Sequence, residues 1–339
     1  MKKIGFWNNY TCFANNKAFD PNAYGIGEDL AYPLLLLKEK LEKEGYILET
    51  LDLDKPENYE VILFCDYPNP ETCCVDITSI PKEKKYLLLT ECELVYKPNA
   101  RKDLLENFGK VFTYDDALIK ECGYKKLFLP NKIKAPLFVP YNNKKISTVI
   151  AGNRTIKEKG ELYSERLKAI RFMEKNHPNE FDLFGFNWDK KTFTGPKVIT
   201  YFNRFNDLRK IFAEKHICYR GKIDNKLEVL SKYKFCFCYE NTNAIPGYIS
   251  EKIWDCFFAG CIPVYYGAPN VTDYIPDNVF IDFRNFNSYE ELYNFLININ
   301  EEQYNQYLRN TKEFLLSDKA YNFSAENYAY TLIKEIENK

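Results

Sequence analysis

Histidine is scarce in this sequence: only His177 and His216 occur among 339 residues. His177 precedes Pro178 in a polar turn, and His216 lies in the stretch "EKHICYRGK". A catalytic triad centred on histidine, or a metal site built from several histidines, is therefore not expected. Any chemistry has to come from other side chains.

Long apolar runs and an excess of one charge are also missing. No window approaches the roughly 18 uninterrupted apolar residues that a membrane span needs, and the opening "MKKIGFWNNYTC" lacks the apolar region of a signal peptide. The formal net charge is -1, so no overall basic field attracts nucleic acid. We expect neither a transmembrane anchor nor a nucleic-acid partner.

The sequence contains no Cys-x-x-Cys pair, although it has 11 cysteines. Most of them lie in apolar runs such as "KFCFCYE" and "DCFFAGC". This usage is typical of reduced cysteine that serves as a small hydrophobic residue, and a zinc site is not expected. We therefore expect a cytoplasmic protein, including one at the inner face of the membrane, and leave peripheral membrane association open.

What the sequence does contain is an alternation of short apolar runs with longer amphipathic stretches. In the first half, the apolar runs at 2–7, 46–54, 59–68, 84–91 and 109–118 are predicted strands, the last with a short helix after Asp115, and 32–45 is a predicted helix that Gly45 ends. In the second half, strands are expected at 147–153, 180–186, 234–241 and 261–267, with helices at 161–176, 227–233, 250–260, 288–316 and 324–338. Continuous apolar strands alternating with helices indicate α/β domains with parallel sheets.

The alternation breaks in a proline-containing stretch, "LFLPNKIKAPLFVPYNNKK", which is the natural linker between two domains. We therefore predict a first domain over 1–140, a second over 141–315, and a C-terminal helix within 316–339 that could pack back on the first domain. In parallel sheets, ligands bind beyond the carboxyl ends of the strands, so two facing halves predict one deep cleft.

One segment of the second half places charged residues at a helix entrance. The stretch "KFCFCYENTNAIPGYISEKIWDCFFAG" runs from an apolar strand through a loop into a helix with Ser250 as N-cap and Gly260 at its end. Glu251 in the first turn suits the helix dipole, and the free N–H groups with Lys252 suit a phosphate. Glu251 can also accept hydrogen bonds from ribose hydroxyls. The spacing therefore fits a nucleotide with a pyrophosphate.

This region resembles the donor-binding signature of the α-1,3/4-fucosyltransferase family. The segment "YKFCFCYENTNAIPGYISEKIWDCFFAGCIPVYYGAPNVTDYIP" keeps its apolar strand, Y-E-N, Y-I-S-E-K-I helix start and P-V-x-x-G strand in register. Two further segments are similar to the family: "ELYSERLKAIRF", and "LLLTECELVYKPN" followed by "FTYDDAL". The first ~80 residues carry no resemblance.

The resemblance implies a GT-B fold of two Rossmann-like domains facing across a cleft. It also implies an inverting α-1,3-fucosyltransferase that moves L-fucose from GDP-fucose to a hydroxyl of an acceptor glycan, in α-1,3 or α-1,4 linkage. An oligosaccharide or glycoconjugate containing N-acetylglucosamine is the expected acceptor. GDP-fucose is a substrate, so no cofactor and no metal are expected.

The resemblance places the catalytic base at Glu91, which follows the strand "YLLLT". One positioned carboxylate is enough to deprotonate the acceptor hydroxyl. Glu93 is the second choice, because the local sequence departs from the family pattern.

The expected donor-binding residues fall on the loop and helix start and on the stretch before 166. Lys252 is expected to bind the pyrophosphate and Glu251 the ribose, while Asn241 and Tyr248 line the pocket. Glu240 either lines it or fixes the loop, and Ser250 caps the helix. The family carries an arginine at the position of Lys159, with Arg154 or Arg166 as substitutes. For Arg166 and Lys168 a solvent-facing position on the helix is favoured.

Three other interpretations remain open. The Asp52 and Asp54 pair in "LDLDK" could mark a metal-dependent GT-A enzyme. The protein could use another GDP-linked sugar. It could also be a binding protein without catalytic activity, which would keep Glu251 and Lys252 but need no base.

Overall fold

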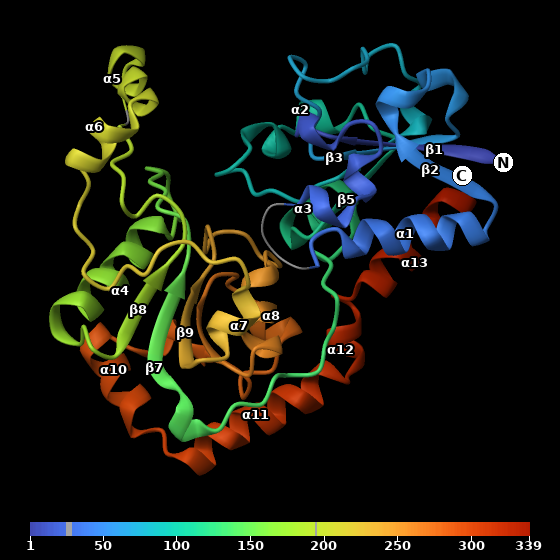
Figure 1. Ribbon diagram of the computed structural model, residues 1–339. Helices are drawn as coiled ribbons and strands as arrows, with labels where there is room; N and C mark the ends of the chain where they lie inside the picture. Colours follow the sequence, from blue (N-terminus) through green and yellow to red (C-terminus); the bar gives the residue numbers. More distant parts are fainter. Residues whose placement is uncertain (25–28, 194) are drawn as a thin grey trace.

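The computed structural model describes residues 1–24, 29–193 and 195–339 and contains two sheets, each with its own helices (Figure 1). The N-terminal sheet is parallel, with strand order β2-β1-β3-β4-β5-β6. Its strands are β1 (Lys2–Asn8), β2 (Tyr46–Thr50), β3 (Val61–Cys65), β4 (Lys85–Leu88), β5 (Lys110–Thr113) and β6 (Lys125–Lys126). Four consecutive side chains of β3, from Val61 to Phe64, are fully buried, so both faces of this sheet are covered.

The C-terminal sheet is also parallel, with strand order β11-β10-β9-β7-β8. Its strands are β7 (Lys145–Ile150), β8 (Phe181–Phe184), β9 (Tyr233–Tyr239), β10 (Ile262–Tyr266) and β11 (Ile281–Asp282). The predicted strands of both halves are confirmed, and the short edge strands β6 and β11 are additional.

Helices flank both sheets. The first domain has α1 (Tyr32–Lys43), α2 (Lys102–Leu105) and α3 (Asp116–Cys122). The second has α4 (Tyr163–Asn176), α5 (Lys197–Tyr201), α6 (Asn206–Ile211), α7 (Lys226–Leu230), α8 (Glu251–Phe258), α9 (Val271–Tyr274), α10 (Tyr289–Asn298), α11 (Glu301–Leu315) and α12 (Asp318–Tyr321), and α13 (Ala325–Glu337) ends the chain. The sequence analysis assigns no element between 187 and 217, where α5 and α6 form. None of the helices in the described ranges is long and apolar enough to cross a bilayer.

Each sheet has one point at which the direction of chain progression reverses. In the N-terminal sheet β1 lies between β2 and β3, and in the C-terminal sheet β7 lies between β8 and β9. Helices leave the carboxyl ends of the strands in opposite directions at such a point, which opens a crevice there. Cavities lie at both points, and the larger one is lined by residues of both domains. Two Rossmann-like domains therefore face each other across a cleft, as the GT-B expectation requires.

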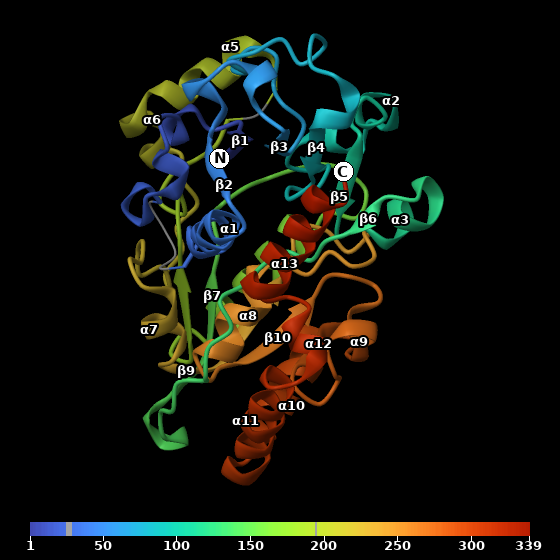
Figure 2. The ribbon, with the colours of Figure 1, turned by 90° about the vertical axis from the view of Figure 1, so that its right-hand side faces the viewer.

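The last helix returns to the first domain. After α11 and α12 the chain crosses over, and α13 lies against α1 (Figures 1 and 2). Ala329, Leu332 and Ile336 of α13 are buried in the same apolar cluster as Ile4 and Leu37 of the first domain. The chain terminus therefore completes the core of the N-terminal domain.

The two domains also touch beside the loop that precedes α8. Gly247 of this loop has a φ of +82°, and a Cβ there would lie 2.4 Å from the Tyr114 carbonyl oxygen of the N-terminal domain. Asn270 Nδ2 donates to Asp116 Oδ2 at 2.9 Å across the same boundary. A residue with a side chain at 247 would push the domains apart, so this loop needs its glycine.

Candidate active site

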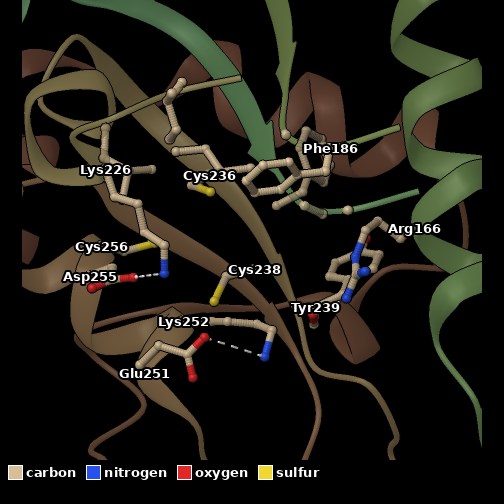
Figure 3. A pocket seen from close by; sticks show the side chains of 17 residues that line it. Arg166, Phe186, Lys226, Cys236, Cys238, Tyr239, Glu251, Lys252, Asp255 and Cys256 are labelled. Atoms are coloured by element: carbon tan, nitrogen blue, oxygen red, sulfur yellow. Dashed lines mark hydrogen bonds and ion pairs between the residues drawn. The ribbon is translucent and has the colours of Figure 1, made fainter. Parts of the chain in front are cut away.

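The first cavity, of about 210 Å³, lies at the reversal point of the C-terminal sheet (Figure 3). Its walls come from the carboxyl ends of three strands and from the start of α8. Phe186 and Cys236 supply apolar surface, while Arg166, Lys252 and Glu251 supply charge. A pocket with apolar walls and two cations suits a ligand that joins a flat ring to a diphosphate.

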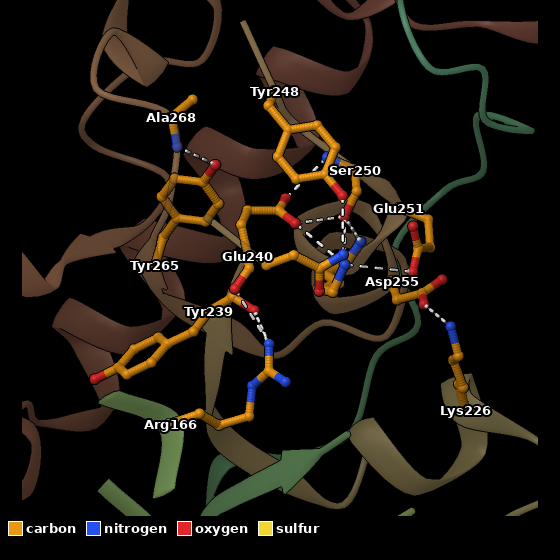
Figure 4. Close-up of polar contacts among 12 residues, drawn as sticks. Arg166, Lys226, Tyr239, Glu240, Tyr248, Ser250, Glu251, Asp255, Tyr265 and Ala268 are labelled. Carbon is orange, nitrogen blue, oxygen red and sulfur yellow. Dashed lines mark hydrogen bonds and ion pairs between the residues drawn. The ribbon is translucent and has the colours of Figure 1, made fainter. Parts of the chain in front are cut away.

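The start of α8 is held by a buried carboxylate (Figure 4). Ser250 is the N-cap, as expected, because its Oγ accepts from the Lys252 N–H. The Ser250 N–H and Oγ donate to the two oxygens of Glu240 at 2.8 and 2.7 Å. Glu240 is fully buried. Of the two roles considered for Glu240, the structure therefore supports the fixing of the loop, since its side chain has no free surface for a ligand.

Lys252 belongs to the same network. Its Nζ donates to Glu240 at 3.1 Å and to Ser250 Oγ at 2.9 Å, which leaves one of its three N–H groups for a ligand. Burial alone would lower the pKa of Lys252, but the carboxylates of Glu240 and Glu251 outweigh it and raise that pKa. Lys252 is therefore a fixed, permanently charged ammonium in the pocket wall.

Arg166 corrects the preference for a solvent-facing position. This side chain is only 5% exposed, and its guanidinium donates to the carbonyl oxygens of Tyr239 and Glu240 at 2.6 and 3.2 Å. It reaches the pocket because α4 packs over the carboxyl end of β9 (Figures 3 and 4). Lys168, by contrast, is exposed and pairs with Glu165, as expected. Arg166 is the buried cation that can join Lys252 on a diphosphate.

A second charged pair lines the pocket on the side of α7. Lys226 Nζ lies 2.9 Å from Asp255 Oδ2, and both side chains border the two cavities. Burial would raise the pKa of Glu251, but Lys252 and Lys226 outweigh it and hold that pKa at about 2. Glu251 is therefore an ionised acceptor at the pocket rim, as a ribose ligand requires. The sequence analysis missed Asp255, although it lies one helical turn beyond Glu251.

Tyr248 has a different environment from the one expected. Its ring is 2% exposed and lies 5.0 Å, centroid to centroid, from Tyr114 of the first domain. Cys92 and Ile245 complete this small apolar cluster between the domains. The hydroxyl of Tyr248 accepts from Asn241 Nδ2 at 3.1 Å. Tyr248 therefore packs at the domain boundary and positions Asn241, and the cavity does not include its ring.

Glu91 lies on the opposite side of the cleft, at the carboxyl end of the β4 region, as predicted. Burial raises the pKa of its carboxyl, and the nearby Asp66 carboxylate adds to the rise, while Lys252 and Arg154 act against it. Lys252 and Arg154 belong to the other domain, so the field of the pocket reaches Glu91 across the cleft. A carboxylate whose pKa is raised is a suitable proton acceptor.

Asp66 holds the segment that carries Glu91. It is 7% exposed, and its oxygens accept from the N–H groups of Thr90 and Glu91 at 2.7 and 3.0 Å, and also from Thr90 Oγ1 and Asn99 Nδ2. Asp66 has a φ of +63°, an uncommon conformation for a residue with a side chain. The sequence analysis missed Asp66, which lies inside the strand predicted over 59–68 but directly follows β3 in the structure.

The remaining predicted residues lie further from the pocket. Glu93 is exposed, and so are Arg154 and Lys159 on the loop after β7. Among these, Arg154 lies close enough to Glu91 to affect its pKa. Glu91, Glu93 and Lys159 do not line either cavity. Glu91 is nevertheless partly buried and lies near Lys252, whereas Glu93 is exposed, which favours Glu91 as the base. Arg166 lines the first cavity and is favoured over Lys159.

The aspartate pair of the metal-dependent alternative lies elsewhere. Asp54 pairs with Lys3 at 2.7 Å, and Asp52 accepts from the Asn15 N–H at 2.8 Å. Both support turns at the edge of the N-terminal sheet. The Asp-x-Asp pattern is therefore structural here, and it does not face the cleft between the domains.

A second cavity, of about 320 Å³, is larger than the first and lies between the two domains. Asn8, Cys65 and Thr90 line it from the reversal point of the N-terminal sheet. Glu251 and Asp255 line it from the other domain and border the first cavity as well. The two cavities are therefore neighbours that share part of their walls, with Arg166 and Lys252 lining the first and Thr90 of the Glu91 segment lining the second.

Solved structures with this fold include glycosyltransferases. An α1,3-fucosyltransferase aligns over 100% of this chain and 90% of its own, with a TM-score of 0.56 and 16% identity. The DNA-modifying enzyme β-glucosyltransferase aligns over 99% of both chains, with a TM-score of 0.56 and 14% identity. At these identities the likeness establishes the GT-B fold and nothing more specific.

Sequence comparison is more specific for the second domain. Residues 199–334 match the model of the glycosyltransferase family 10 (fucosyltransferase) C-terminal domain. The α-(1,3)-fucosyltransferase FucT of Helicobacter pylori is 38% identical over 74 residues, which cover 22% of this chain and 15% of that protein. α-(1,3)-Fucosyltransferase B of Drosophila melanogaster is 41% identical over 85 residues, covering 24% and 19%. The matched segments thus span less than a fifth of either relative. Over residues 199–334, the chain is therefore similar to glycosyltransferase family 10, the fucosyltransferase family.

Proposed function

We propose that the protein is an inverting fucosyltransferase that moves L-fucose from GDP-fucose to a hydroxyl of a glycan containing N-acetylglucosamine. The observation that carries this proposal is that Glu91, held beside Asp66 in the first domain, lies close enough to Lys252 of the second domain for that cation to act on its pKa. One domain offers a proton acceptor and the other offers cations for a leaving diphosphate. Named relatives form α-1,3 and α-1,4 linkages, so both remain part of the proposal.

Glu91 would act as the general base. It removes the proton of the acceptor hydroxyl as that oxygen attacks the sugar carbon from the face opposite the leaving group, which inverts the configuration. Burial, together with the nearby Asp66 carboxylate, raises the pKa of Glu91, which strengthens it as a base. Asp66 would be a positioning residue, because it binds the backbone of Thr90 and Glu91 rather than a substrate.

Lys252 and Arg166 would stabilise the departing GDP. Negative charge grows on the diphosphate as the bond to the sugar breaks, and fixed donors aimed at that charge lower the barrier. Both cations are held in place by the protein, Lys252 by Glu240 and Arg166 by two backbone carbonyl groups. They therefore need little reorganisation during the reaction.

The direct test is calorimetric titration of the purified protein with GDP, UDP and CMP, followed by transfer assays. We expect GDP to bind at least about tenfold more tightly than UDP or CMP, which corresponds to about 1.4 kcal/mol. Transfer from GDP-fucose should continue in EDTA and yield a product of inverted anomeric configuration. Equal affinity for the three nucleotides would contradict the proposed donor.

Two alternatives are separated by the same assays. Faster transfer from another GDP-linked sugar, such as GDP-mannose, would keep the site but change the donor. Tight GDP binding without transfer to any acceptor would indicate a binding protein. Glu91→Gln should lower kcat about 10²- to 10⁴-fold and leave GDP affinity unchanged, because the base does not touch the nucleotide. Glu93→Gln, two residues away and exposed, is the matched control and should keep wild-type turnover.

All eleven cysteines are free thiols, and six of them are buried. Buried thiols in an enzyme of this size support a reducing compartment, so we place the reaction in the cytoplasm. A glycan precursor assembled there, such as that of a lipopolysaccharide, fits as the acceptor. Loss of transfer activity under mild oxidation, with recovery after reduction, would support this location.

A further inference from the structure

A helical arm leaves the second domain beyond the carboxyl end of β8. It consists of residues 197–212, which contain α5, a short 3-10 turn at Phe202–Arg204, and α6. In Figure 1 this arm, coloured yellow, stands away from the body of the domain. Its base is fixed, because the Lys191 N–H donates to the Arg209 carbonyl oxygen and Arg209 Nε donates to the Lys191 carbonyl oxygen. The arm is therefore an anchored projection, and none of its residues lines either of the two cavities.

Large apolar side chains on the arm face solvent. Val198 is 76% exposed, Ile211 75% and Phe212 58%, and Ile199, Tyr201 and Phe205 are exposed as well. Exposed apolar residues scattered singly need no explanation, but several of them within 16 consecutive residues form a patch. Phe202 and Phe212 are partly covered by contact with the ring of Phe193, and Tyr201 and Phe205 contact each other within the arm.

The same residues carry an excess of positive charge. Lys197, Arg204, Arg209 and Lys210 are opposed within the arm only by Asp207, although the whole chain has a net charge of -1. None of these four cations forms a salt bridge with a described residue. Arg204 instead lies over the ring of Tyr201, at 5.1 Å from its centroid. Basic and apolar groups are thus interleaved on an exposed helical segment.

This combination distinguishes between classes of partner. A glycan offers hydroxyl groups, which aromatic rings and hydrogen-bonding groups recognise, and the aliphatic side chains of Val198, Ile199 and Ile211 would contribute nothing to it. An anionic lipid surface uses both features, since apolar side chains enter the boundary of the acyl chains while lysine and arginine pair with phosphate groups. Tyrosine and phenylalanine are favoured at that depth. The observations therefore favour a membrane over a sugar chain.

We propose that residues 197–212 dock the protein on the surface of an anionic lipid bilayer. The arm is joined to the donor pocket at both ends: Gly185 and Phe186 precede it, Ile223 follows it, and all three line the first cavity. A bilayer held by the arm would lie beside the edge of the sheet at which the cleft opens. This inference does not depend on the identity of the donor.

Vesicle flotation of the full-length protein tests the proposal. Vesicles of phosphatidylcholine mixed with phosphatidylglycerol should bind the protein about tenfold or more tightly than vesicles of phosphatidylcholine alone, and added salt should weaken the binding. Ile211→Glu with Phe212→Glu should abolish binding. Lys197→Gln with Arg204→Gln and Lys210→Gln should lower it to the level seen on neutral vesicles.

The matched control is Leu316→Glu, which places the same charge at a side chain that is 83% exposed, on the far side of the domain after α11. It should bind vesicles as the wild type does. Thermal unfolding of each variant shows whether the fold is kept. No binding to anionic vesicles, or equal binding to neutral ones, would overturn the proposal. So would arm variants that change only the dimerisation seen by light scattering, or only the KM for a water-soluble acceptor.

Discussion

Among single residues, the most informative is Glu91, because burial of its carboxyl disfavours the charged form and raises its pKa. Since the folded-state pKa of Glu91 lies above the ordinary value of 4.5, the folded protein binds its proton more readily than the unfolded chain does. Stability is therefore lost as pH rises from about 4.5 through the folded-state pKa. Glu91→Gln removes this cost, so we expect a higher Tm than wild type at pH 7 and no difference below about pH 4, measured by calorimetry.

The raised pKa of Glu91 also predicts how catalysis depends on pH. The acid limb of kcat/KM should have an apparent pKa above the 4.5 of an ordinary glutamate, because Glu91 must be ionised to accept a proton. An acid limb below 4.5, or a Tm for Glu91→Gln that is lower than wild type at pH 7, would contradict the assigned environment.

Arg166 and Lys168 form a natural pair for comparison on one helix. Arg166 is buried in the pocket wall and Lys168 is exposed. We expect Arg166→Ala to weaken GDP binding about tenfold to a hundredfold, in line with the loss of a hydrogen bond to a charged group, whereas Lys168→Ala should leave it unchanged in calorimetry. If the two substitutions changed GDP affinity equally, Arg166 would have only a structural role.

Asp66 should affect turnover without affecting the donor. Asp66→Ala removes the oxygen that accepts from the N–H groups of Thr90 and Glu91, which would displace the Glu91 carboxylate. We expect kcat to fall about tenfold to a hundredfold, since a shift of ~1 Å at a reacting group has that effect. The GDP dissociation constant should not change. A parallel loss of GDP affinity would mean that Asp66 only supports the fold.

At the scale of elements, the start of α8 combines a cap with a binding site. Ser250→Ala removes the cap, at a cost of about 1 kcal/mol, and also removes a partner of Glu240 and Lys252. Ser288 caps α10 through the Glu291 N–H and touches neither cavity. We expect both alanine variants to lower stability in urea titrations, but only Ser250→Ala to weaken GDP binding. A Ser288→Ala variant with the same loss of affinity would mean that the loss comes from reduced stability, and it would contradict a role of Ser250 in the binding site.

Elements with local signals were predictable, and the packing between them was not. Ser250 and Gly260 mark the ends of α8 in the sequence itself. The burial of Arg166 depends on contact with the backbone of Tyr239, 73 residues away, so no local pattern reveals it. The same holds for Tyr248, whose ring is covered by Tyr114 of the other domain. The interval 187–217 lacks apolar periodicity because the side chains of α5 and α6 do not face a core.

At the scale of the whole molecule, the C-terminal helix links the ends of the chain. Leu332 of α13 is fully buried in the core of the N-terminal domain, although it lies only seven residues from the terminus. We expect Leu332→Ala to cost about 2–5 kcal/mol of unfolding free energy, measured in urea. Tyr330→Ala, on the exposed face of the same helix, should change it by less than about 0.5 kcal/mol. A small effect of Leu332→Ala would mean that α13 is dispensable for the first domain.

The proposed mechanism requires a diphosphate between Arg166 and Lys252, with Glu91 facing it from the other domain. A crystal structure of the protein with GDP would show directly whether the nucleotide binds there. We expect the diphosphate to lie beside both cations and the base of the nucleotide to lie against the apolar wall near Phe186. GDP found in any other place, or beside Lys252 with the Glu91 carboxylate turned out of the cleft, would contradict it.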